Sequence, residues 1–269
     1  MKENTYVIGV GKDDEERLSL LNELFGKTSK DLLLKAGLKP GQRVLEVGCG
    51  TGNMTKWIAK QVGDNGHITA VDISHEQVKI AQENCSESNN VTFITSSVFD
   101  LKQEKQFDLV YSRFLIMHLQ NPFEGLQHLT QLLKPNGVLV SEEATNSVTA
   151  CYPESPIFRK YRKLVMALFE KNNIDFDIGE KLYAYFRKLK LEDIHVNFVQ
   201  PIYKKHQKKI MVLLMNELKH RYIELGIVTK DEMQAFINDL SNFINDDQFL
   251  ESFARTTQIF GHINLQKKN

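Results

Sequence analysis

The fold is decided at Val44-Leu45-Glu46-Val47-Gly48-Cys49-Gly50-Thr51-Gly52, where an apolar strand pattern ends in an acid and runs into a glycine-rich turn. Glycines in such a turn let the backbone approach a ligand closely. A dinucleotide-binding loop needs a third glycine at position 53, where this chain has Asn53, so the spacing argues against NAD. An acid at this place suits a ligand with an ammonium group better than a pyrophosphate. The alternative is an ordinary tight turn with a surface glutamate.

A second carboxylate ends the next apolar run. Asp72 follows the glycine turn by about 20 residues, the spacing at which a nucleotide-binding α/β domain places its ribose ligand. A carboxylate there can accept both hydroxyl hydrogens of a ribose, a two-bond contact that a phosphate group does not provide. Because Asp72 is followed by Ile73 and Ser74, it could instead cap a helix N-terminus.

Around these residues, short β-rich runs alternate with helical stretches, which is typical of a parallel sheet covered on both faces. The pattern predicts strands at residues 43–47, 68–72, 91–95, 107–112 and 137–142, with helices at 54–62, 75–83 and 122–133. Before them, residues 15–35 predict one or two helices packed across the start of the sheet, and the charged run 12–17 predicts a solvated helix start.

The two acids and the glycine turn resemble the Rossmann-fold S-adenosylmethionine-dependent methyltransferases, in the methyltransferase-domain group that includes quinone C-methylating enzymes. The resemblance covers residues 37–143 and implies an α/β fold: a Rossmann-like seven-stranded, mostly parallel sheet with helices on both faces and helical cap insertions in the C-terminal half. It implies S-adenosyl-L-methionine as cofactor. The cofactor-binding residues that it implies are Glu46, Gly48, Cys49, Gly50, Thr51 and Gly52 at the methionine end, Asp72 at the ribose, and Ile73, Ser97, Val98 and Phe99 at the adenine. Ser97 stands where the family usually has an aspartate.

The segment from Phe107 to His118 resembles the family's fourth strand and the loop that lines the methyl-transfer site. Ser112 and Arg113 are expected beside the cofactor. His118 could act as a base for an acidic acceptor proton, and Arg113 could hold an anionic group of the substrate. Each has a structural alternative: Arg113 could pair with a core carboxylate, and His118 could pack at a helix start.

The C-terminal half predicts amphipathic helices at residues 157–169, 182–189, 210–222 and 233–244, and strands at 192–199 and 253–263. Thr229 and Glu232 form a capping-box pattern before the last helix. We therefore expect an N-terminal helical segment (1–36), a cofactor-binding core (37–146), and helical insertions with the last strands (147–269). The helices of 203–250 are expected to form a cap with 157–169 and 182–189, and a homodimer interface is the alternative. Residues Tyr6 to Gly9 resemble a short segment that closes over the cofactor in relatives.

Composition narrows the choice of acceptor and compartment. Lys plus Arg and Asp plus Glu both number 34, so no net charge draws the 269-residue chain to nucleic acid. The chain shows no secretory signal or membrane-spanning run, and its three cysteines suit neither a disulfide framework nor a metal site, which favours the cytoplasm. We expect methyl transfer to O, N or C of a small molecule. RNA or protein methylation, and a non-catalytic cofactor-binding module, remain alternatives.

Overall fold

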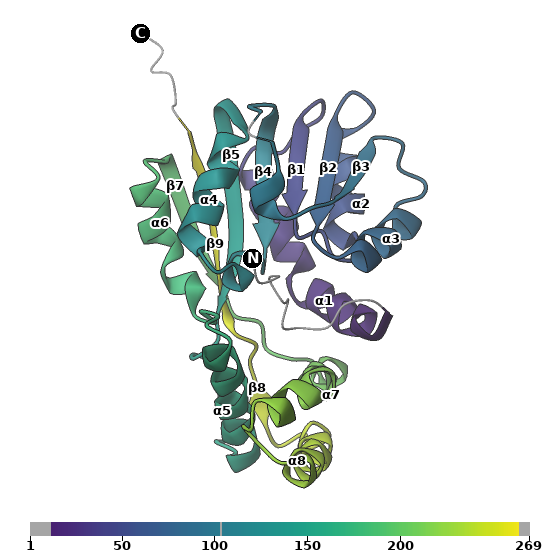
Figure 1. The fold of residues 1–269 in the computed structure, drawn as a ribbon, viewed down its shortest axis with the longest axis vertical. Helices are drawn as coiled ribbons and strands as arrows, with labels where there is room; N and C mark the ends of the chain where they lie inside the picture. Colours follow the sequence, from purple (N-terminus) through teal and green to yellow (C-terminus); the bar gives the residue numbers. More distant parts are fainter. Residues whose placement is uncertain (1–11, 103, 264–269) are drawn as a thin grey trace.

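A computed structural model describes residues 12–102 and 104–263 (Figure 1). The predicted segment at residues 6–9 lies outside them. The first half contains α1 (Lys12–Lys35), β1 (Arg43–Val47), α2 (Asn53–Val62), β2 (His67–Asp72), α3 (His75–Asn84), β3 (Val91–Thr95), η1 (Val98–Asp100), β4 (Phe107–Arg113), η2 (Ile116–His118), α4 (Pro122–Gln131) and β5 (Leu133–Thr145). The second half contains β6 (Cys151–Tyr152), α5 (Pro156–Lys171), η3 (Ile178–Glu180), α6 (Leu182–Lys188), β7 (Glu192–Val199), η4 (Lys205–Gln207), α7 (Lys209–Glu224), α8 (Lys230–Phe243), β8 (Leu250–Glu251) and β9 (Arg255–His262).

The main sheet has seven strands in the order β3-β2-β1-β4-β5-β9-β7. The first five pair in parallel, while β9 runs antiparallel to both of its neighbours, β5 and β7. The predicted mostly parallel seven-stranded sheet is confirmed. Because the chain moves outward from β1 to β3 and then returns to place β4 on the other side of β1, the strand order reverses between β1 and β4, where open α/β sheets bind ligands.

Helices cover both faces of the sheet, as the alternation of apolar side chains along the strands requires. Val44, Leu109 and Val140 belong to one buried cluster with leucines of α1 and apolar residues of α2. Leu45 and Val110, one position along the same strands, belong to the opposite cluster with leucines of α4 and α6. A one-residue shift in register would exchange these faces, so the two clusters fix the pairing.

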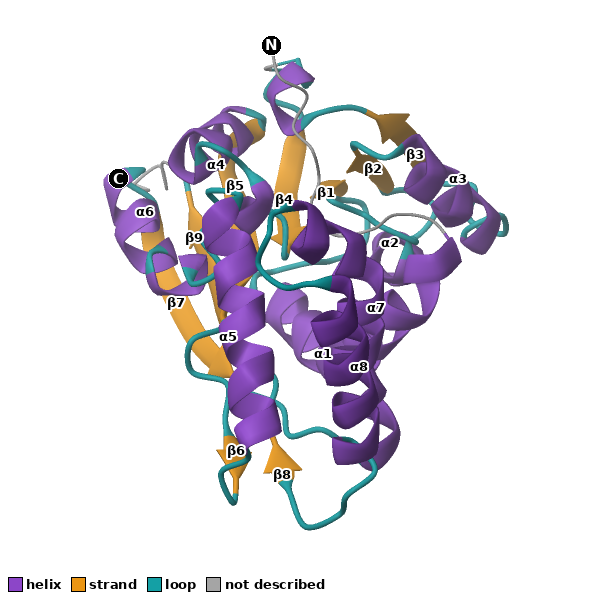
Figure 2. Ribbon diagram, turned by 60° about the horizontal axis from the view of Figure 1, so that its bottom comes forward, coloured by secondary structure: helices purple, strands orange, loops and turns teal. Residues whose placement is uncertain are grey.

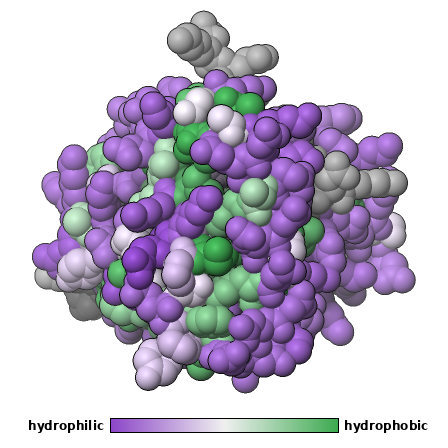
Figure 3. Space-filling view, turned by 90° about the horizontal axis from the view of Figure 1, so that it is seen from below, coloured by the Kyte–Doolittle hydropathy of each residue, from purple (hydrophilic) through white to green (hydrophobic). Residues whose placement is uncertain are grey.

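A helical layer lies beyond the carboxyl ends of the strands. Buried side chains of α5, α7 and α8 form one cluster with Leu20 of α1. Figure 2 shows these three helices gathered beside α1. Ser155 accepts a hydrogen bond from the Phe158 amide and Pro156 follows it, so α5 begins there; the predicted capping box of Thr229 and Glu232 begins α8. Seen from below, apolar side chains gather in the middle of this layer with polar ones around them (Figure 3).

The structure differs from the sequence analysis at three places. The helix at 182–189 does not join the cap, since Leu182 and Phe186 of α6 pack on the sheet against β9. The short pair β6 and β8 was not predicted, and two residues per strand give too little alternation to detect. Arg17, in the charged run expected to be solvated, is 6% exposed. No helix in the described part of the chain has the length and apolar character needed to cross a bilayer.

Candidate functional site

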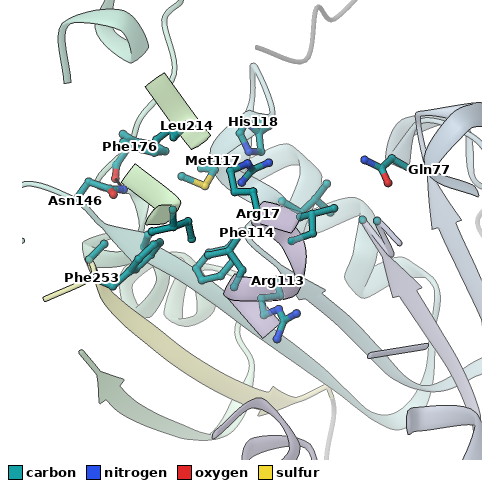
Figure 4. A pocket seen from close by; sticks show the side chains of 18 of the residues that line it. Arg17, Gln77, Arg113, Phe114, Met117, His118, Asn146, Phe176, Leu214 and Phe253 are labelled. Carbon is teal, nitrogen blue, oxygen red and sulfur yellow. Dashed lines mark hydrogen bonds between the residues drawn. The ribbon is translucent and has the colours of Figure 1, made fainter. Parts of the chain in front are cut away.

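A cavity of about 480 Å³ lies where β1, β2 and β4 end, between the sheet and the helical layer. Its walls come from α1, the turns after these strands, α3, α5 and α7, and its volume is in the range of small-molecule sites. Figure 4 shows Gln77 at one end of this cavity, Asn146 and Phe176 toward the other, and Arg17 next to His118 between them. The cavity therefore joins the predicted cofactor site to the space under the helical layer.

The turn after β1 needs glycine for two different reasons. Gly48, Gly50 and Gly52 have φ of 77°, 51° and 80°, a left-handed conformation that other residues adopt at a cost. A Cβ on Gly52 would lie 3.0 Å from the Cβ of Ala81 on α3, whereas a Cβ on Gly50 would have Leu18 of α1 as its only neighbour within 4 Å among the residues that the structure describes. Gly50 thus leaves backbone open to the cavity, while Gly52 allows the turn to pack on α3 and lies outside the cavity lining.

Asp72 joins the glycine turn to the start of α3. Its Oδ2 accepts the Gly50 amide at 2.9 Å and its Oδ1 accepts the Ser74 amide at 3.0 Å. The helix cap itself is Ser74, whose hydroxyl accepts the Gln77 amide, so the alternative of Asp72 as the N-cap is wrong. Burial raises the pKa of Asp72, and its carboxylate lines the cavity with acceptor capacity remaining for further donors.

Glu46 is the buried acid at the end of β1. It is 4% exposed, its Oε2 accepts the Thr55 hydroxyl at 2.6 Å, and it lines the cavity. Burial raises its pKa to about 7, against the opposing effects of the Thr55 hydrogen bond and the nearby charge of Arg113. The surface-glutamate alternative is therefore wrong, and a cationic ligand group placed here would stabilise the ionised form.

Four predicted adenine-end residues fall in different places. Ile73, Ser97 and Val98 line the cavity, and Ile73 keeps 48% of its surface exposed. Ser97 caps η1 by accepting the Phe99 amide. Phe99 itself lies outside the cavity lining and packs edge-on against His128, with ring centroids 6.3 Å apart.

The segment after β4 turns sharply into the cavity. Phe114 has a φ of 53°, a conformation that costs of order 1–3 kcal/mol in a non-glycine residue and persists only when surrounding contacts enforce it. Glu143 at the end of β5 supplies such contacts, because its carboxylate accepts the amides of Leu115, Ile116 and Met117 at 2.9, 2.7 and 3.4 Å. These bonds hold the segment that presents Phe114 and His118.

The three predicted residues of this segment differ in environment. Ser112 is fully buried, exchanges a hydrogen bond with Ser141, and lies outside the cavity lining. Arg113 lines the cavity and donates to the Ser29 hydroxyl of α1 at 3.0 Å. His118 lines the cavity too, and burial together with the charge of Arg17 lowers its pKa to about 3, so its imidazole is neutral.

The helices expected at 157–169 and 210–222, which are α5 and α7, line the cavity, whereas sequence reasoning missed the part of the wall that α1 provides. Arg17 of α1 pairs through Nε with Glu217 of α7 at 2.9 Å, although 200 residues separate them. Tyr161 and Arg162 of α5 and Tyr203 also line the cavity. A single sequence carries no signal for such pairing. In residues 12–102 and 104–263, no group of three His, Cys, Asp or Glu side chains is placed to hold a metal.

The comparisons with known proteins agree with this geometry. Residues 38–195 match the methyltransferase domain family. Demethylmenaquinone methyltransferase of Staphylococcus aureus (strain MRSA252) is 28% identical over 147 residues, which cover 53% of this chain and 58% of that protein. This chain thus spans less than two thirds of that relative.

Two solved structures share the fold over almost the whole chain. Haemonchus contortus phosphoethanolamine N-methyltransferase 2 in complex with S-adenosyl-L-methionine has a TM-score of 0.51 at 17% identity, covering 92% of this chain and 52% of that chain. The 4+2 cyclase SpnF has a TM-score of 0.52 at 16% identity, covering 94% and 98%. Since the family match takes in more than half of its length, the chain belongs to the methyltransferase domain family, as the glycine turn and Asp72 predicted.

Proposed function

We propose that the chain is an enzyme that transfers the methyl group of S-adenosylmethionine to a small-molecule acceptor. One observation carries the proposal: Glu46, Asp72 and the open backbone of Gly50 face a cavity that continues past the predicted cofactor site to Phe176 and α7. Family membership supports methyl transfer, and the room beyond the cofactor end supports a second, small ligand.

The residues present suit this cofactor. A carboxylate at Glu46 matches an ammonium group, Asp72 has acceptor capacity for a ribose diol, and a side chain on Gly50 would enter the space left for the ligand. Cys49 and Thr51 line the same end, and Ile73, Ser97 and Val98 line the adenine end. Gly48 lines the same end of the cavity, and a Cβ there would come within 3.3 Å of Leu115. Gly52, Phe99 and Ser112 support this site from outside the cavity lining.

S-adenosylmethionine brings a methyl group that its sulfonium already activates, so the protein's task is alignment and exclusion of water. Phe114 and Met117 present apolar surface to the cavity from the held segment after β4. Arg113 lies beside Glu46 and favours its ionised form. The neutral His118 can accept a hydrogen bond from the acceptor, and it takes up a proton only where a nearby negative charge offsets Arg17.

The volume of the cavity supports a small molecule as the acceptor, methylated at O, N or C. The similarity to demethylmenaquinone methyltransferase supports a partly apolar acceptor. The fold shared with the 4+2 cyclase SpnF favours a second candidate, in which the cavity serves another reaction class, because fold does not determine function. A cytoplasmic location, supported by three free cysteines, completes the proposal.

The test is calorimetric binding of S-adenosylhomocysteine followed by turnover of labelled S-adenosylmethionine with a metabolite panel. Asp72→Ala should weaken binding roughly tenfold or more, since a hydrogen bond to a charged group is worth about 1.5–3 kcal/mol. Asp64→Ala, at an exposed loop position, is the matched control and should bind normally. Equal affinity in folded Asp72→Ala and Asp64→Ala would remove the assigned site. Binding without turnover of any acceptor would favour the second candidate.

A further inference from the structure

The acids that line the cavity lie at its cofactor end. Among the described lining residues these acids are Glu46 and Asp72, at the ends of β1 and β2. Figure 4 places Gln77 at one end of the cavity and Asn146 toward the other. The lining that α5 and the segment after β5 contribute contains no acid in the part of the chain that the structure describes. The end of the cavity near Asn146 therefore lacks the lining charge that would repel an anion.

Arg162 of α5 lines this second end and is held beside the chain that follows β5. Its Nη1 donates to the Thr149 carbonyl oxygen at 3.2 Å, and the Thr149 amide donates to the Asn146 carbonyl oxygen at 3.1 Å. Among residues 12–102 and 104–263, no carboxylate pairs with Arg162, and the Thr149 carbonyl is the only group to which its guanidinium donates. Because a guanidinium carries five N–H donors in a rigid fork, Arg162 presents a positive charge and further donors at the cavity.

Hydroxyl groups accompany Arg162 in the lining. The Thr149 hydroxyl is buried, and within the described residues it has no hydrogen-bond partner. Tyr161 and Tyr203 line the cavity as well, and burial raises the pKa of both, so their phenol groups are neutral and able to donate. A buried donor without a partner is unfavourable, and a bound oxygen that accepts from Thr149 removes that penalty.

The rest of the lining from α5 and α7 is apolar. It consists of Phe158, Val165, Met166, Ile210 and Leu214. Such a surface covers hydrocarbon and offers no charge that competes with Arg162 for an anion. It also excludes water, which strengthens a charge pair relative to the same pair in solvent.

We propose that Arg162 and the Thr149 hydroxyl anchor an anionic oxygen group, a carboxylate or a phosphate, at the end of the acceptor remote from the methylated atom. This proposal rests on the proposed function. The acceptor is then a small anion whose apolar segment lies against α5 and α7. Arg162 determines specificity without taking part in the methyl transfer, because it binds the remote end of the acceptor.

The experiment compares matched anions and neutral analogues by calorimetry with S-adenosylhomocysteine at saturation. The carboxylate arm uses hexanoate against hexanamide, and the phosphate arm uses hexyl phosphate against hexanol. Wild type should prefer the anion roughly tenfold or more in one or both arms, as for a charge-assisted hydrogen bond, and the arm that shows the preference identifies the group. Equal binding of anion and neutral analogue in both arms, or binding of neither anion at millimolar concentration, would overturn the proposal.

Two pairs of variants assign the preference. Arg162→Gln keeps an amide that can donate to the Thr149 carbonyl but has no charge, so it should bind anion and neutral analogue alike. Lys163→Gln removes the same charge at the next, exposed position of α5 and should keep the preference. Thr149→Val should weaken anion binding severalfold, and Thr149→Ser, which retains a hydroxyl, should not. A loss in Lys163→Gln as large as that in Arg162→Gln would refute the assignment.

The neutral analogues and the cofactor separate the remaining explanations. If Arg162 only holds the chain after β5, Arg162→Gln will weaken hexanamide and hexanol as much as the anions, which would contradict the anchor. Arg162→Gln should bind S-adenosylhomocysteine as wild type does, and loss of S-adenosylhomocysteine with the anion preference retained would assign Arg162 to the cofactor carboxylate instead. If wild type fails to bind S-adenosylhomocysteine, the proposed function fails, and the anion preference measured without S-adenosylhomocysteine still decides the inference about Arg162.

Discussion

Cofactor affinity should depend on pH through Glu46. Its pKa is about 7 in the free protein because burial disfavours the carboxylate, and a cationic ligand group beside it would lower that pKa. At pH 6 only about a tenth of the carboxyl groups are then ionised, against about nine tenths at pH 8. The dissociation constant for S-adenosylhomocysteine should therefore rise roughly tenfold from pH 8 to pH 6, and binding at pH 6 should release close to one proton.

Calorimetry in buffers of different ionisation enthalpy measures both quantities between pH 5.5 and 8. Glu46→Gln keeps an oxygen that can accept the Thr55 hydroxyl but has no charge to titrate. Its affinity should fall below wild type by about a hundredfold at pH 8, since release of nearly one proton at pH 6 requires the ligand to lower the pKa of Glu46 by roughly two units, and it should approach wild type at pH 5.5, where the wild-type side chain is mostly neutral as well. Parallel pH profiles for wild type and Glu46→Gln, or no proton release at pH 6, would refute the reasoning.

Two further predictions concern stability. Burial and the charge of Arg17 lower the pKa of His118 to about 3, below its unfolded value, so the stability that the neutral imidazole contributes is present above pH 6.5 and is lost as pH falls toward 3, by up to about 5 kcal/mol. In urea unfolding, His118→Gln should therefore reduce the loss of stability between pH 6.5 and 3. An unchanged loss in that range contradicts this prediction. Gly52→Ala should destabilise by about 2–3 kcal/mol, more than the control Gly226→Ala at about 1 kcal/mol, because both glycines have positive φ but only Gly52 adjoins α3; equal losses would contradict the packing role.

The parallel core could be predicted because its signals are local. Short β-rich apolar runs and turn residues predicted β1 and β3 with the bounds observed, and the glycine turn and Asp72 indicated where the cofactor site lies. The family followed from the same residues. These features need no knowledge of distant partners, so a single sequence contains them.

The rest depends on contacts between distant segments. The amphipathic stripe of α6 shows that one side of this helix is buried, but it does not show whether the sheet or the helical cap packs against that side. Arg17 is charged and near a helix start, which are the features of an exposed side chain. Its burial accompanies an ion pair with Glu217, which the sequence places 200 residues away. Ser112 and Arg113 are adjacent and point to opposite faces, and the register with β5 decides which one reaches the cavity.

The place of β9 in the sheet bears on how the protein folds during synthesis. Among the described strands, β7 pairs only with β9, which is made some 60 residues later, after the whole excursion through α7 and α8. At a synthesis rate of roughly 5–20 residues per second, the nascent chain waits for seconds with β5 as an open edge and with β7 and α6 undocked. An unpaired, apolar β5 edge is a template for association with other chains, so chaperone dependence and aggregation should concentrate in this interval. Adding β9 closes the β5 edge and anchors β7, so the last strand of the sheet to be made completes it.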